Sequence, residues 1–412
     1  MRILLVSPAP IGQNTAELGG VAGYTTDLAR ALGDLGHSVG VATAGHVYTP
    51  GPLRRREGRC RAERLAPLDG IERYQIVNSP VLAPSLWQFG EPESEQRQPL
   101  IERAFASILK RQSPEVVHIH GFEGLCSTIV RLSREAGARV LVSLHNYHPF
   151  CPQVYLMRGR RRLCLDYDAG RACESCEAVI DVARERVRRA LAPDASPPTI
   201  QPPPLPPIQT FRRDGSPTAE TLRLWHGRHP HWQPMEHDAL PSDAPPSSAP
   251  ARSVAGRYAA RRSAFVGALN DADRVIAVSN TVAEIAAGMG VDRGRITVNR
   301  IGSWAASAPR VEPPANDPAE RGQLRLVFLG FNNYYKGLPV LVDAIGLLTP
   351  AFRSRVHLAA IGTNCDAIAS RVDPLRPHIG GVEIGGSYDR NSVSDLLQHR
   401  HLGVVPSVWH DN

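Results

Sequence analysis

Lys336 is the residue whose position in the sequence most clearly predicts chemistry. It is one of two lysines among the 47 basic residues of the chain, and it follows an apolar run, 324–329, that ends at Gly330. An amphipathic helix is predicted to begin directly after it, at Gly337. A compact ammonium group beside the free N–H groups of a helix N-terminus can bind an anion such as a phosphate. An ordinary solvated lysine in a first helical turn is the alternative.

Two further candidates lie in the N-terminal half. Gly19 and Gly20 stand between a predicted strand, 2–7, and a predicted helix, so their backbone could approach a phosphate. A flexible loop is the alternative. The Gly-x-Gly-x-x-Gly spacing of nicotinamide-dinucleotide sites is absent, and the second predicted strand ends at 42–44 without an acidic residue. His145 ends another predicted strand, where it could make a structural hydrogen bond or contact a ligand.

Four cysteines in one short stretch have the residue type and number of a structural metal site. Cys173 and Cys176 form a Cys-x2-Cys pair, and Cys151 and Cys164 precede it. Four thiolates can close a tetrahedral zinc site, although the first two spacings are longer than those of common zinc ribbons. Free or packed thiols are the alternative, and we expect no catalytic thiol among them.

Composition narrows the class of protein. The net charge is +7, but only 21% of residues are charged and no basic stretch is interleaved with aromatic residues, so nucleic-acid binding is not expected. The segment 178–192 reads as a basic amphipathic helix, which could lie on anionic lipid or could cap a domain. Without an apolar run of about 18 residues or a signal peptide, a cytoplasmic protein is expected, with peripheral contact at the inner face of the membrane as an option.

Alternating strand and helix patterns predict an α/β protein with two Rossmann-like, doubly wound parallel-sheet domains. Residues 1–192 and 263–304 are assigned to the N-terminal domain, and 321–412 to a C-terminal domain. Fifteen of the 36 prolines lie between 193 and 250, so 193–262 is interpreted as a disordered insertion. A linker is predicted over 305–320. Ligands of such sheets bind at the carboxyl ends of the strands.

Six segments, in this order, resemble the retaining glycosyltransferases of family 4. They are GGVAGYTTDLARALGDLGHSV, VVHIHG, VLVSLHNYHPFCP, DADRVIAVSN, LRLVFLGFNNYYKG and PSVWHDN. The resemblance covers most of the chain outside the proline-rich insertion. It implies the GT-B fold of two Rossmann-like domains, and the use of nucleotide-diphosphate sugars.

The resemblance also implies roles for individual residues. Gly19 and Gly20 match a glycine loop near the donor phosphates and the acceptor, and His145 matches a histidine that faces the donor sugar. Lys336 matches the lysine that holds the diphosphate. Asp411 stands where the family has the first glutamate of a Glu-x7-Glu motif. The implied catalytic residues are His145, Lys336 and Asp411, and the implied donor and phosphate site comprises Gly19, Gly20, Gly330, Lys336 and Gly337.

Three positions depart from the family pattern. Phe331 replaces an arginine, which removes one cation from the diphosphate site, and Ile301 replaces the asparagine of an Asn-Gly pair. The sequence ends at Asn412, one residue after the acidic position, so it contains neither the second glutamate nor the last strands of the second sheet. We therefore expect an incomplete second domain, from a fragment or a C-terminally truncated and defective product.

The sequence thus predicts a retaining glycosyltransferase of hexosyltransferase type that needs no cofactor for catalysis. It would move a sugar from a nucleotide-diphosphate donor to a glycan or a lipid-linked acceptor, as in surface polysaccharide synthesis. A structural zinc ion is the metal considered. Two alternatives stay open: a non-catalytic remnant that binds a nucleotide or a partner, and a nucleotide-dependent oxidoreductase with two Rossmann domains. The missing glycine fingerprint disfavours the second.

Overall fold

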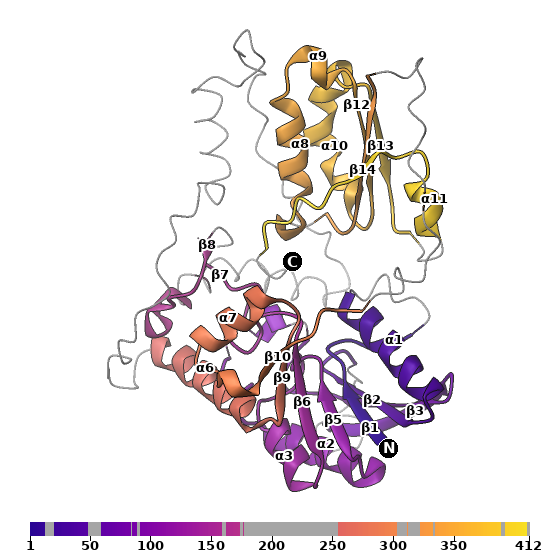
Figure 1. Ribbon diagram of the computed structural model, residues 1–412. Helices are drawn as coiled ribbons and strands as arrows, with labels where there is room; N and C mark the ends of the chain where they lie inside the picture. Colours follow the sequence, from indigo (N-terminus) through magenta and orange to yellow (C-terminus); the bar gives the residue numbers. More distant parts are fainter. Residues whose placement is uncertain are drawn as a thin grey trace. The chain divides into compact units, whose positions relative to one another are not determined.

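The computed structural model describes residues 1–12, 20–47, 59–83, 85–88, 91–158, 162–173, 176, 254–302, 311, 322–332, 334–388 and 392–409. The chain divides into two compact units (Figure 1). The described residues up to 302 belong to the first unit, and those from 311 onward belong to the second.

The first unit is built on an eight-stranded sheet with the order β10-β9-β6-β5-β1-β2-β4-β3. Every neighbouring pair is parallel except β3 and β4. The strands are β1 Arg2–Val6, β2 Ser38–Ala44, β3 Arg61–Leu68, β4 Ile71–Val77, β5 Val116–Ile119, β6 Arg139–Leu144, β9 Arg274–Ala277 and β10 Ile296–Val298. A two-stranded ribbon, β7 (Met157–Arg158) with β8 (Arg162–Leu163), follows β6 in the chain.

Strand β1 is buried on both faces. Ile3 and Leu5 pack with Ala29 of helix α1 (Gly20–Asp34) in one cluster, which also includes residues of β2. Leu4 and Val6 alternate with them and are fully buried on the opposite face. This two-sided burial explains why the strand is an uninterrupted apolar run in the sequence.

Strands β3 and β4 form a hairpin at one edge of the sheet. Asp69 and Gly70 connect them, and both have positive φ, of 50° and 78°, as a tight two-residue hairpin turn requires. The pairing shifts register between Leu65 and Leu68, and Pro67 lies inside the shift. Proline cannot donate to a strand ladder, so its place on an outer strand is the one the backbone permits.

Helices cover the sheet and carry much of the buried surface. In α2 (Pro99–Gln112) the spacing of the buried residues is that of a single helix face, Ile101, Ala104, Phe105, Ile108 and Leu109. The helices α3 (Ile129–Glu135) and α7 (Asn280–Gly288) are shorter. Ser279 caps α7, because its hydroxyl accepts a hydrogen bond from the N–H of Val282 at 3.2 Å.

Helix α6 corrects one predicted boundary. The proline-rich insertion was expected to run to residue 262, but α6 spans Val254–Asp271. No proline occurs after Pro250 until well beyond this helix, and the side chains of Tyr258, Phe265 and Leu269 are buried. The packing of this apolar face explains why residues 254–262 belong to a helix.

The second unit contains a four-stranded parallel sheet in the order β13-β12-β11-β14. The strands are β11 Leu324–Leu329, β12 Val356–Ile361, β13 Gly381–Gly385 and β14 Leu402–Gly403. Leu326 and Phe328 pack with helix α8 (Leu338–Gly346) on one face, while Val327 packs with Leu396 and Leu397 of α11 (Val393–Leu397) on the other. This unit also contains the short helices α9 (Pro350–Arg353) and α10 (Ala369–Val372).

The predicted fold class is confirmed, since both units are α/β and their main sheets are parallel apart from the pair β3 and β4. The sequence also predicts strands at 296–298, 324–329 and 356–361, and the strands of the structure have those bounds. The sequence predicts a helix over 125–136, but the helix of the structure is shorter, because 122–128 forms turns before α3 begins. The hairpin of β3 and β4, strand β13 and helix α2 were not predicted. The predicted helix over 178–192 and the linker from 312 to 320 lie outside the described residues.

Candidate functional sites

Three histidines gather where β5 and β6 end. These strands are parallel neighbours, so residues that follow them reach the same edge of the sheet. Nδ1 of His120 lies 3.0 Å from Nε2 of His145, and Nε2 of His118 lies 2.8 Å from the hydroxyl of Ser143. The structure therefore gives His145, predicted as a lone residue, a hydrogen-bonded histidine neighbour.

The three imidazoles are uncharged at neutral pH. Burial lowers the pKa of His145 to about 4. Burial, with a smaller effect of His145, likewise lowers the pKa of His118 to about 4. The pKa of His120 lies well below its ordinary value because of burial and of its two histidine neighbours. The cluster cannot neutralise a phosphate, since it carries no charge at pH 7.

The histidine cluster has hydrogen-bonding capacity to spare. Nε2 of His120 and Nδ1 of His145 have no hydrogen-bond partner within the described parts of the chain. The ring of Tyr24, from α1, lies against both, with centroids 5.6 Å from His120 and 5.0 Å from His145. A neutral imidazole offers one donor and one acceptor, so the arrangement suits hydroxyl groups of an uncharged ligand.

Lys336 occupies the predicted position at a helix start in the second unit. The short 3-10 turn Tyr334–Lys336 follows β11, and α8 begins at Leu338 after Gly337. The side chain of Lys336 is half-buried, and its Nζ lies 5.9 Å from the ring centroid of Trp409. Neighbouring N–H groups at the start of α8 would share any anion that Lys336 binds.

Glycines permit close backbone contacts around Lys336. Gly337 has φ 73°, and a Cβ there would stand 1.8 Å from the carbonyl oxygen of Pro406. A Cβ at Gly362, which follows β12, would stand 1.9 Å from the carbonyl oxygen of Gly330. The ends of β11 and β12 therefore approach each other so closely that only glycine fits, and the same holds for the start of α8 and Pro406.

Residues 406–409 lie beside the turn that contains Lys336, and the sequence did not predict this contact. The carbonyl oxygen of Tyr335 accepts hydrogen bonds from the hydroxyl of Ser407 and from the N–H of Val408, both at 3.0 Å. These bonds bring Trp409 beside Lys336. These residues belong to the segment PSVWHDN. That segment resembles the family, but the resemblance did not predict the contact with Tyr335 and Lys336.

Other predicted site residues are placed as follows. Gly20 is the first residue of α1, and a Cβ there would meet no atom within 4 Å. Phe331, at the position of the family arginine, is partly exposed. Gly19 and Asp411 lie outside the described residues, as do the positions next to each of them at 18 and 410.

The four predicted metal-binding cysteines line one small cavity together with Arg262. Across the described residues, however, no three His, Cys, Asp or Glu side chains already have the arrangement of a metal site. The four thiols therefore line the same cavity, but their spacing is not that of a metal site.

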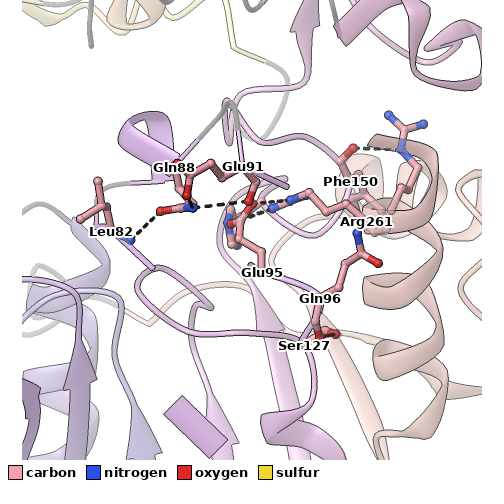
Figure 2. Close-up of polar contacts among 10 residues, drawn as sticks. Leu82, Gln88, Glu91, Glu95, Gln96, Ser127, Phe150 and Arg261 are labelled. Carbon is pink, nitrogen blue, oxygen red and sulfur yellow. Dashed lines mark hydrogen bonds and ion pairs between the residues drawn. The ribbon is translucent and has the colours of Figure 1, made fainter. Parts of the chain in front are cut away.

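A buried charge cluster close to the histidines was not predicted. Glu95 accepts hydrogen bonds from Nε of Arg261 at 2.5 Å and from Nε2 of His148 at 2.7 Å, and all three side chains are 1% exposed. Figure 2 shows Arg261, from α6, pointing at Glu95. Burial alone would raise the pKa of Glu95, but Arg261 and His148 outweigh it and lower that pKa to about 2.

This cluster ties together three segments that are distant in the sequence. Glu95 precedes α2, and its carbonyl oxygen also accepts from the N–H of Ser127 at 2.8 Å. His148 belongs to the turn that follows β6, three residues after His145. Glu95 is therefore the residue that fixes the chain immediately beyond the histidine cluster to α6.

Comparison with known proteins gives a family match over part of the chain. Residues 18–205 match the family model described as Glycosyltransferase Family 4. Similar solved structures include sucrose-phosphate synthase from Thermosynechococcus elongatus, with 14% identity, a TM-score of 0.49, and coverage of 100% of this chain and 76% of that chain. Trehalose 6-phosphate synthase from Burkholderia multivorans has 12% identity, a TM-score of 0.47, and coverage of 98% and 77%.

HepE of Anabaena, solved with UDP and glucose, has 13% identity, a TM-score of 0.43, and coverage of 99% and 74%. No curated protein matches the chain. The family match includes the glycine loop and the ends of β5 and β6, so the resemblance read from the sequence is confirmed there. Over residues 18–205 the chain is thus similar to the glycosyltransferases of family 4.

Proposed function

We propose that the chain is a retaining glycosyltransferase that moves a sugar from a nucleotide-diphosphate donor to a glycan or lipid-linked acceptor. The bond between the anomeric carbon and the diphosphate oxygen breaks, and a bond to the acceptor oxygen forms on the same face. The acceptor proton passes to the departing diphosphate. Such a reaction needs positive charge at the leaving group more than it needs a protein nucleophile.

The observation that carries the proposal is the position of Lys336 at the start of α8. Its ammonium group and the first N–H groups of the helix supply charge and hydrogen bonds for a diphosphate without a metal ion. Gly337 lets the start of α8 approach the carbonyl oxygen of Pro406, and this close contact fixes the backbone next to Lys336. We assign donor binding to Gly330, Lys336 and Gly337, with Gly19, Gly20 and Asp411 kept as proposed contacts from the family resemblance.

His145 is proposed to contact hydroxyl groups of the donor sugar. The ring is uncharged, and one of its nitrogens lacks a partner in the described chain, which suits a hydroxyl and argues against a role as phosphate ligand. The low pKa also argues against a general base, since a group with a pKa of about 4 is a weak proton acceptor at neutral pH.

A direct assay tests the proposal. The purified chain is incubated with a panel of nucleotide-diphosphate sugars and oligosaccharide or polyprenyl-phosphate acceptors, with and without EDTA. We expect nucleoside diphosphate release that survives EDTA, with the donor's anomeric configuration retained in the product by proton NMR. Donor binding without turnover across the whole panel would favour the non-catalytic remnant. Hydride transfer to a nicotinamide would favour the oxidoreductase.

The contribution of His145 has a signature in the pH profile. We expect kcat/KM to inflect near pH 4, where His145 becomes charged, and not near 6.5, the ordinary histidine value. His145→Gln should abolish that inflection and lower kcat/KM about tenfold, the size of one lost hydrogen bond.

His37→Gln is the matched control for this measurement. His37 precedes β2, so it lies at the amino-terminal edge of the same sheet, away from the histidine cluster. It should leave the profile unchanged. An unchanged profile in His145→Gln would instead remove His145 from the site.

Contact with a membrane is a separate proposal. Among the described residues, none of the helices combines the length and the apolar character that crossing a bilayer requires. The basic segment 178–192 is the proposed peripheral contact. Flotation with vesicles of anionic lipid tests it, and a chain that stays in the soluble fraction at low salt contradicts it.

A further inference from the structure

The four cysteines of the segment 151–176 surround one cavity in the first unit. Cys151, Cys164, Cys173 and Cys176 line it together with Arg262, and its volume is about 10 Å³, close to that of one water-sized sphere. Three of the thiols are buried and Cys151 is partly buried. Thiol groups from four positions thus face a space large enough for a single ion.

Arg262 is a buried cation beside these thiols. Its side chain is 7% exposed, its Nε donates to the carbonyl oxygen of Phe150 at 2.9 Å, and its guanidinium lies 3.3 Å from the ring centroid of Tyr167. No carboxylate forms an ion pair with it among the described residues. The preceding residue on α6, Arg261, is buried too but is paired with Glu95.

A thiol carries no charge, whereas a thiolate bound to a metal ion is negative. Without a metal, the cavity would hold the buried guanidinium of Arg262 beside neutral thiols, which is a costly arrangement for a charge removed from water.

We propose that Cys151, Cys164, Cys173 and Cys176 bind one zinc ion as a tetrathiolate, with Arg262 as its counter-ion. On binding, the four thiols release four protons to solvent, and the complex carries two negative charges. The thiols must close around the ion, since the described side chains do not yet have metal-site spacing. Zinc prefers this sulfur donor set in structural sites, and Arg262 offsets one of the two charges.

The site would join two parts of the chain that the proline-rich insertion separates. All four cysteines precede the insertion, whereas Arg262 lies on α6, which follows it. Cys173 and Cys176 already pack against Tyr258 of α6, and Tyr167 packs on the same group. Zinc would therefore hold the segment 151–176, which precedes the insertion, against α6, which follows it. Its role would be structural and not catalytic.

Metal analysis of the full chain tests the site. After purification without chelators or an affinity tag that binds metal, mass spectrometry should give about one zinc per chain. Cys173→Ser and Cys176→Ser should lose it, while Cys126→Ser and Cys365→Ser should keep it. Cys126 and Cys365 are also buried but lie outside the cavity.

A metal-free wild-type chain whose seven thiols all react under native conditions would overturn the proposal. So would a cysteine variant of the cavity that retains the full zinc content. The wild-type chain is also loaded with cobalt, so that one test does not depend on the folding of a variant. A tetrathiolate gives intense visible bands that a mixed nitrogen and oxygen site does not, and their absence would contradict the assignment.

The role of Arg262 has its own readout. Arg262→Met should weaken zinc binding about tenfold in competition with a chromophoric chelator, and Arg262→Lys should restore part of the loss, because the charge is what the tetrathiolate needs. Equal zinc affinity in Arg262→Met and wild type would show that the guanidinium is not the counter-ion.

Discussion

Glu95→Ala is expected to lower the free energy of unfolding by about 3–5 kcal/mol, measured by urea denaturation followed by circular dichroism. The substitution leaves the guanidinium of Arg261 buried at 1% exposure without its carboxylate. Most of the destabilisation comes from the unpaired guanidinium and not from the loss of the ion pair itself. A buried cation without its partner has neither water nor a counter-ion around it. The same substitution removes the carboxylate that accepts the hydrogen bond from Nε2 of His148.

Glu93→Ala is the matched control for this result. Glu93 also pairs with an arginine of α6, Arg257, but both side chains are at least 40% exposed. Solvent screening limits such a pair to about 1 kcal/mol or less. If Glu95→Ala and Glu93→Ala destabilised the chain equally, burial would not be what makes the Glu95 pair important.

The pH dependence of stability gives a second check on Glu95. Its pKa in the folded chain is about 2, below the ordinary value of about 4.3. A depressed carboxyl pKa contributes stability above the unfolded value, and this contribution is lost as the pH falls through the folded pKa. The difference between wild type and Glu95→Ala should thus be full near neutral pH and shrink between about pH 4 and pH 2.

Lys336→Ala is expected to lower kcat/KM for sugar transfer about a hundredfold, equivalent to about 3 kcal/mol of transition-state stabilisation. The ammonium group would no longer neutralise the charge that develops on the leaving diphosphate. Lys336→Arg should recover only part of the rate, since a planar guanidinium does not replace a compact ammonium at a site framed by glycines.

The control uses the other lysine of the chain. Lys110 is exposed on α2 in the first unit, so Lys110→Ala should change neither the rate nor donor binding. Lys336→Ala should also weaken binding of the free nucleoside diphosphate by calorimetry. A Lys336→Ala chain with wild-type kcat/KM would remove the physical basis of the proposed function.

Strands buried on both faces were the part of the fold that the sequence predicted best. β1, β11 and β12 are apolar runs because helices cover both sides of a parallel sheet, and that cause acts within a few residues. β3 and β13 were missed because an edge position leaves polar side chains in water and blurs the pattern. Their strand identity comes from pairing with β4 and β12, which no local window contains.

The same distinction applies to the candidate sites. Lys336 was predicted from a strand, a glycine and a helix start within a dozen residues. The partners of His145 depend on which strands are neighbours, so His118 and His120 could be joined to it only through the sheet order. Glu95 and Arg261 are 166 residues apart, and nothing in either local sequence indicates the other.

The outermost hairpin has a consequence for how the chain behaves at high concentration. Among the described strands β3 lies at the edge of its sheet, and an edge strand presents a row of backbone donors and acceptors on which another molecule could add a strand. Arg61, Glu63 and Arg64 place charge along that row, and Pro67 with its register shift interrupts it. These residues work against intermolecular β-pairing, so neutral substitutions there would promote aggregation while leaving the fold of each molecule intact.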